Sequence, residues 1–205
     1  AFNLSGLTAG AANGGSTTAG TITAAVAADL TLNGSANLGA TVVTVASNAE
    51  LTLSVSQANG KTITGAQATS GGSHHGGSVV VTGLDTSAFN LSGLTAGAAN
   101  GGSTTVGTLK AAVAADLTLN GSANLGSVVV TVAKDAALTL SASQASGKTI
   151  TGAQAESGET GGSVVVTGLD GSAAYLLNLL TAGAANGNTA GSITAAVAAD
   201  VTLNG

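Results

Sequence analysis

Asp29-Leu-Thr-Leu-Asn-Gly-Ser-Ala-Asn-Leu-Gly39 recurs letter for letter at Asp116–Gly126, 87 residues along the chain. The segment Phe2–Thr18 returns at Phe89–Thr105 with the same spacing. A fixed period of this size is typical of repeat architectures, in which each unit completes the core of its neighbour. The sequence therefore divides into repeat 1 (residues 1–87), repeat 2 (residues 88–172) and a partial repeat 3 (residues 173–205).

The composition favours a folded chain that is built from small aliphatic side chains. Of the 205 residues, 44% are hydrophobic and only 6% are charged, with a net charge of −5. Disorder usually accompanies low hydrophobicity and high net charge. The chain lacks Cys, Pro, Met and Trp and has three aromatic residues, so no large ring can anchor a thick core.

The same composition excludes several partners. Four lysines and no arginine oppose nine carboxylates, so there is no basic patch for a phosphate backbone and we expect no nucleic-acid partner. The sequence contains no apolar run of the length that a membrane span requires. We also expect no catalytic residue and no cofactor, because no nucleophile–base arrangement is visible.

Alternation of apolar and polar residues with period two predicts β-strands. In Glu50–Ser56 we expect Leu51, Leu53 and Val55 to point inward, together with their copies Leu138 and Leu140. Asn-Gly pairs between such segments predict turns, because both residues tolerate positive φ. The segment Thr21–Asp29 fits helical and strand spacing equally well, and we favour a strand.

Two all-β architectures fit this pattern. The first is a parallel β-solenoid (β-helix) of short strands, with about 20 to 24 residues per turn and therefore about four turns per 87-residue repeat. The alternative is a tandem array of Ig-like β-sandwiches, whose strands pair mainly antiparallel and recur every 8 to 12 residues or so. The missing Trp and Pro and the small side chains favour the solenoid.

The strings Ala137–Gly152 and Gly162–Asp170 resemble segments of very large bacterial β-strand-repeat surface proteins, which are adhesins, S-layer-like proteins and biofilm-matrix proteins rich in Thr, Val, Gly and Ala. The resemblance rests on composition and cadence and covers essentially the whole chain. It implies an extracellular, structural or adhesive role at a cell surface and supplies no catalytic residues. The Gly-Gly-x-Gly-x-Asp motif through which many of these proteins bind calcium is absent.

Five aspartates recur at two phases of the repeat and are weak candidate ligands for calcium: Asp29, Asp116 and Asp200 at one phase, and Asp85 and Asp170 at the other. Calcium needs six to eight oxygen ligands, which stacked turns could bring together. We favour the alternative that these short side chains hydrogen-bond the turns in which they lie.

Three other groups have ordinary explanations. His74 and His75 lie in a Gly/Ser loop with no third His and no Cys, so we expect a loop variation and no zinc site. Glu156 and Glu159 lie close together in the corresponding variable loop of repeat 2, so we do not expect them to be a glycosidase pair of carboxylates. The threonines of Thr62-Ile-Thr64 and its copy could form the ranks of an ice-binding solenoid, which is the remote alternative to the β-propensity of Thr.

We therefore expect a non-enzymatic extracellular structural protein whose repeats assemble with other copies into a filament, matrix fibre or surface layer. The alternative is a stalk or binding segment of a large repetitive adhesin, with a surface glycan or another cell as partner. Both ends copy internal sequence and neither looks like a polar cap. We read this as an excerpt of a longer array or as a subunit whose ends other subunits cover.

Overall fold

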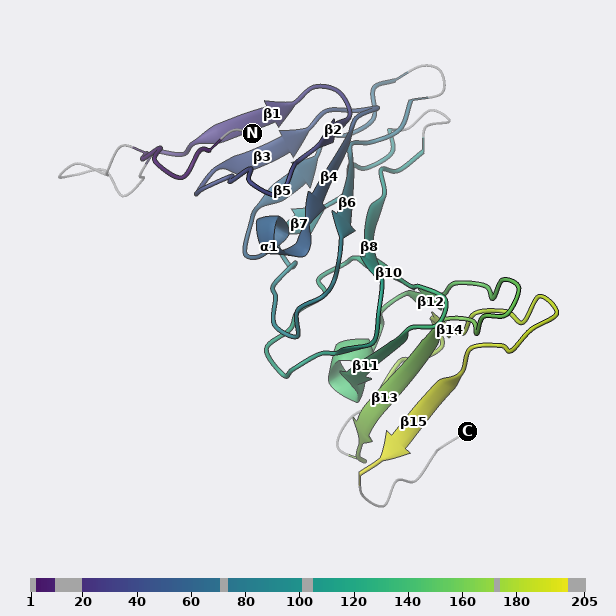
Figure 1. The fold of residues 1–205 in the computed structure, drawn as a ribbon. Coiled ribbons are helices and arrows are strands. Elements are labelled where there is room, and N and C mark those ends of the chain that lie inside the picture. The colour runs from purple at the N-terminus through teal and green to yellow at the C-terminus, as the bar shows by residue number, and fades with distance from the viewer. Residues whose placement is uncertain (1–2, 10–19, 71–73, 101–104, 172–173, 199–205) are drawn as a thin grey trace. The chain divides into compact units, whose positions relative to one another are not determined.

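The described part of the chain is all-β apart from two single helical turns (Figure 1). The computed structural model describes residues 3–9, 20–70, 74–100, 105–171 and 174–198. The chain forms two compact units. Unit 1 contains Ala1–Val81 and Leu91–Leu109, and unit 2 contains Thr82–Asn90 and Lys110–Gly205.

The elements follow one another in the same order in both repeats, except that repeat 2 begins with an additional strand. In repeat 1 they are β1 (Thr23–Val26), β2 (Leu30–Thr31), β3 (Val42–Val45), β4 (Glu50–Ser54), α1 (Val55–Ala58), β5 (Ile63–Gly65) and β6 (Ser78–Thr82). In repeat 2 they are β7 (Leu94–Thr95), β8 (Leu109–Val113), β9 (Leu117–Thr118), β10 (Val129–Val132), β11 (Ala137–Ser141), α2 (Ala142–Ala145), β12 (Ile150–Gly152) and β13 (Ser163–Leu169). The partial repeat 3 adds β14 (Leu180–Thr181) and β15 (Ile193–Val197).

Within each sheet, neighbouring strands are alternate strands along the chain. Unit 1 has the strand orders β1-β3-β5-β7 and β2-β4-β6, and unit 2 has β8-β10-β12-β14 and β9-β11-β13-β15. The residue registers of ten of these pairings are defined, and all ten are parallel. The chain thus passes from one sheet to the other and returns beside itself, and we call each such pass a coil. The antiparallel pairing of the sandwich alternative is not found among these strands.

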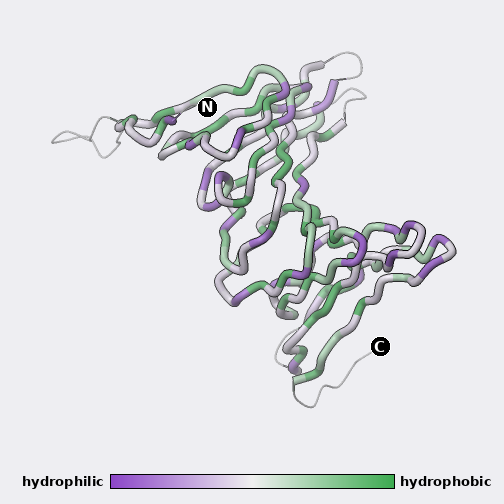
Figure 2. Tube along the Cα trace, in the orientation of Figure 1, coloured by the Kyte–Doolittle hydropathy of each residue, from purple (hydrophilic) through white to green (hydrophobic). Residues whose placement is uncertain are grey.

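The core lies between the two sheets of each unit and consists mainly of Val, Leu, Ile and Ala, with Phe89 also buried. The expected inward residues Leu51, Leu53, Val55, Leu138 and Leu140 are all at most 3% exposed, which confirms the strand faces that the alternation predicts. Apolar stretches accordingly follow the strands, and polar stretches follow the connections, along the chain trace (Figure 2).

The structure confirms one local expectation and corrects another. The ambiguous segment Thr21–Asp29 contains strand β1, as favoured. The strand expected over Glu50–Ser56 ends at Ser54, and Val55 begins the helical turn α1. The reason is a capping box, in which the Ser54 hydroxyl accepts from the backbone amide of Gln57 while the Gln57 side chain accepts from that of Ser54.

A column of glycines joins the two sheets of unit 1 at one corner. The amide of Gly77 donates to the carbonyl of Ala66, Gly97 donates to Gly77, and Gly107 donates to Gly97, over 2.7–2.9 Å. These residues follow β5 and β7 or precede β6 and β8, so strand ends from the two sheets alternate along one hydrogen-bonded line. A Cβ on Gly97 would overlap the Ala66 carbonyl oxygen and lie 2.5 Å from the Gly77 nitrogen.

Unit 2 repeats this column with Gly162, Gly183 and Gly191, which are linked from the carbonyl of Ala153 over 2.9–3.0 Å. A Cβ on each of these three glycines would also overlap backbone. Glycine is therefore required here because two backbones touch, and no side chain fits between them.

Gly97→Ala should destabilise the protein by about 1–3 kcal/mol or more, since the added methyl overpacks against backbone that cannot move aside. Chemical denaturation followed by circular dichroism measures the loss. Gly34→Ala is the matched control, because a Cβ there meets nothing within 4 Å. Equal midpoints for the two variants would contradict the glycine column.

Candidate functional site

The polar side chains that recur in the repeat bind the backbone of a neighbouring coil. Asp29 Oδ1 accepts a hydrogen bond from the Glu50 amide at 2.9 Å, and Asp116 Oδ1 accepts one from the Ala137 amide at 2.8 Å. In each case the donor lies 21 residues further along, at the first residue of the next strand of the same sheet. The carboxylates therefore cap strands β4 and β11.

A glutamine in each unit binds backbone carbonyls of the preceding coil. Gln57 Nε2 donates to the carbonyls of Asn33 (2.6 Å) and Ala36 (3.0 Å), which belong to the preceding coil. Its Oε1 accepts from the Ser54 amide at 2.9 Å, and the residue is only 8% exposed. In unit 2, Gln144 makes the same bonds to Asn120, Ala123 and Ser141.

Two lysines act in the same way. Lys61 Nζ donates to the Gly39 carbonyl at 2.6 Å, and Lys148 Nζ donates to the Gly126 carbonyl. A surface hollow over Gly121–Leu125 is lined by Gln144 and Lys148. Because the polar ends of both side chains already bind backbone, this hollow presents few groups to a ligand.

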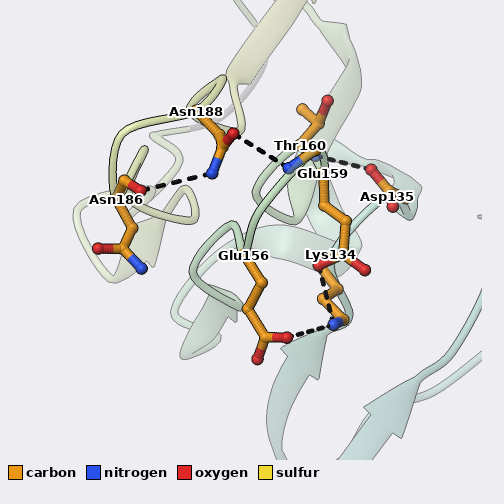
Figure 3. Close-up of polar contacts among 8 residues, drawn as sticks. Lys134, Asp135, Glu156, Glu159, Thr160, Asn186 and Asn188 are labelled. Carbon is orange, nitrogen blue, oxygen red and sulfur yellow. Dashed lines mark hydrogen bonds and ion pairs between the residues drawn. The ribbon is translucent and has the colours of Figure 1, made fainter.

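One corner carries charge in unit 2 and not in unit 1. Lys134 donates to Glu156 Oε2 at 2.7 Å and lies 2.8 Å from Glu159 Oε2 (Figure 3). The residues in the corresponding positions of repeat 1 are Ser47, Thr69 and the His74 loop. The copies thus differ in side-chain chemistry at this corner.

A second kind of contact occurs at this corner in each unit separately. Asp135 has a positive φ of 57° and its Oδ1 accepts from the Thr160 amide at 2.7 Å (Figure 3). Asn48 has a φ of 61° and accepts from the His75 amide at 2.9 Å. Asn and Asp adopt this left-handed conformation more readily than other non-glycine residues, so both copies retain one of the two.

The ion pair between Lys134 and Glu156 shifts the pKa values of these two groups. The hydrogen bond from the Lys134 ammonium, followed by its charge, holds the pKa of Glu156 below its usual value. The two carboxylates in turn raise the pKa of Lys134 above its usual value, the bond to Glu156 contributing most. Because Lys134 and Glu156 each favour the charged form of the other, this pair offers no acid or base poised for proton transfer near neutral pH.

The structure places the candidate calcium ligands apart. Asp29 and Asp116 hold strands as described, Asp170 accepts from the Tyr175 hydroxyl at 2.9 Å, and Asp85 is exposed. Asp200 lies outside the described residues. Within the described part of the chain, no three His, Cys, Asp or Glu residues are grouped as metal ligands would be.

The remaining candidates also have identifiable positions. His74 Nδ1 lies 2.7 Å from Asn48 Nδ2, so the histidine loop contacts the corner residue of the previous coil. Thr64 lies beside Thr44 and Thr95 on adjacent strands, and all three are exposed. Thr131, Thr151 and Thr181 form the same rank in unit 2.

Sequence reasoning missed the glutamines and the bridging lysines. The signal was present, because Ser-x-x-Gln recurs at Ser54 and Ser141 immediately after an alternating strand, which is a capping-box pattern. Comparison with known proteins adds no assignment: no family model, curated protein or solved structure matches this chain.

Gln57→Ala should lower the free energy of unfolding by about 1–3 kcal/mol, because the Asn33 and Ala36 carbonyls and the Ser54 amide lose a partner in a largely buried place. Denaturant midpoints measure this, with faster hydrogen exchange of the Ser54 amide as a local readout. The exposed Gln154→Ala is the control and should change little. A loss no larger than that of the control would show that the bridge contributes nothing.

Lys134→Met should raise the pKa of Glu156 toward its ordinary value, because the ammonium that lowers it is removed. Because the folded-state pKa is depressed, the contact favours folding above the unfolded pKa and is lost as pH falls through the folded value. NMR titration of the Glu156 side chain measures the change, with Lys110→Met as the control. An unchanged pKa in Lys134→Met would mean that the ion pair does not persist in solution.

Proposed function

We propose that this chain is a non-enzymatic extracellular structural protein, a β-solenoid of about four turns per 87-residue repeat, which assembles with further copies into a filament, matrix fibre or surface layer. Parallel pairing between alternate strands along the chain supports the solenoid. The strands β1, β3, β5 and β7 follow one another in one sheet of unit 1, which supports a stack of turns.

A comparison of β8 with β15 carries the proposal. Both strands end in Ala-Ala-Val and begin with a large aliphatic residue. In β8, which has β10 beside it, Leu109 is 6% exposed and Val113 is 0% exposed. In β15, Ile193 is 43% exposed and Val197 is 60% exposed. The same inward face is thus apolar and uncovered, and an unpaired strand edge is a template for a further strand.

The positions of the recurring polar residues support a structural role. Hydrogen bonds to the backbone of adjacent coils are made by the side chains of Asp29, Gln57, Lys61 and their copies. Side chains that hold the fold together in this way are not available for binding substrate. The function that repeats with the sequence is therefore the joining of coils.

The extracellular placement rests on composition and resemblance. Low charge, many Ser, Thr and Gly residues, and likeness to bacterial β-strand-repeat surface proteins all favour a cell-surface location. Within the described residues, no helix has both the length and the apolar character to cross a membrane. Calcium is not needed for the contacts described above.

Two alternatives keep the same fold. As an adhesin stalk, the coils would act as a spacer and a separate domain would bind a glycan or another cell. As an ice-binding surface, the exposed rank of Thr44, Thr64 and Thr95 would face a repetitive ligand. The rank is only one threonine wide on these strands and continues as Ala25 on β1, so we place this alternative last.

The purified chain should form elongated assemblies at high concentration, seen by negative-stain microscopy and sedimentation velocity. Val197→Glu should reduce assembly at least tenfold, because a joint that buries this face as Val113 is buried would also bury the charge. Val106→Glu, at a residue that is 57% exposed outside the strands, is the control. A wild-type chain that stays monodisperse would refute assembly.

A further inference from the structure

The segment Ile193–Asp200 is identical in sequence to Ile22–Asp29. The first contains β15, and the second contains β1, which pairs in parallel with β3. One chain therefore carries two copies of the same strand and an acceptor strand for it. Among the described strands, β1 has a partner on one edge only and β15 likewise.

Two strand pairs, β1 with β3 and β8 with β10, show the register in which this type of strand pairs with the strand beside it. Thr23, Ala24, Ala25 and Val26 lie opposite Val42, Val43, Thr44 and Val45. Lys110, Ala111, Ala112 and Val113 of β8 lie opposite Val129, Val130, Thr131 and Val132 of β10 in the same way. The closing hydrogen bond also recurs, from the Ala46 amide to the Val26 carbonyl and from the Ala133 amide to the Val113 carbonyl, both 2.8 Å.

We propose that β15 of one chain takes the place of β1 on β3 of a second chain, so that copies join head to tail by strand exchange. This rests on the proposed function, since it specifies the joint of the assembly. Ala196 then lies opposite Thr44 of the second copy, and Val197 lies opposite its Val45. The joint reproduces the pairing of β8 with β10.

The free energy of pairing β15 with β3 should be close to that of pairing β1 with β3. Identical sequences make the same backbone bonds to β3, which makes the exchange of an identical element a low-cost route to association. The displaced strand gives up the burial of Val26, which is 8% exposed, while Ile193 and Val197 gain cover. The joint also leads to open, non-closing growth, because the two surfaces it unites are unlike.

Engineered disulfides test the register, since the chain contains no natural cysteine. In Thr44→Cys/Ala196→Cys, oxidation should produce a ladder of covalent dimers, trimers and larger species on non-reducing gels. Residues opposite one another on adjacent strands lie within the Cα separation that a disulfide spans. Each single variant should give no species larger than a dimer.

A second variant tests displacement. In Ala25→Cys/Thr44→Cys, oxidation should join β1 to β3 within one chain and abolish assembly, and reduction should restore it. Assembly that continues with β1 locked, or a ladder formed instead by Ala25→Cys/Ala196→Cys, would overturn the exchange and leave self-assembly standing. Absence of assembly in the wild type would remove the proposed function and the exchange together.

Discussion

Contact between bare backbones at the corner of each unit is the constraint on which this structure depends. The line from Ala66 through Gly77 and Gly97 to Gly107 ties the ends of strands from one sheet to the beginnings of strands from the other. Close approach of this kind leaves no room for Cβ atoms and brings the two sheets together at one side. The buried apolar side chains of the described residues are mostly Val, Leu, Ile and Ala, with Phe89 the one aromatic residue among them.

Side-chain hydrogen bonds supply what the short strands lack. Several strands are only two residues long, and strands of this length make few ladder bonds by themselves. Asp29 satisfies the amide at the start of β4, and Gln57 satisfies two carbonyls in the loop of the previous coil. Because buried polar groups are costly when unpaired, these residues recur at fixed phases of the repeat. Their recurrence reflects the geometry of stacking and not a catalytic or metal-binding requirement.

Alternation in the sequence was sufficient to predict the strand faces, since Leu51, Leu53, Leu138 and Leu140 are all buried. The coil length was hidden because it varies. The steps from β1 to β3, β3 to β5 and β5 to β7 are 19, 20 and 31 residues, so no motif repeats at one short period. The aspartates were expected to bond their own turns, yet Asp29 and Asp116 reach a coil 21 residues away. Contacts of that range depend on how the coils stack, which local propensity does not encode.

The difference between β8 and β15 shows what a repeat sequence specifies. Leu109, Ala111 and Val113 are buried in β8, whereas all five residues of the nearly identical β15 are exposed; β8 has β10 beside it, and β15 has no corresponding strand among the described residues. Each repeat therefore encodes half of an interface, and the other half is supplied by whatever lies next to it. Stability in such a protein grows with every added neighbour, because each new coil buries the face that the previous coil left open. A chain of this kind gains its physical properties from addition of like units, whether those units lie in one polypeptide or in several.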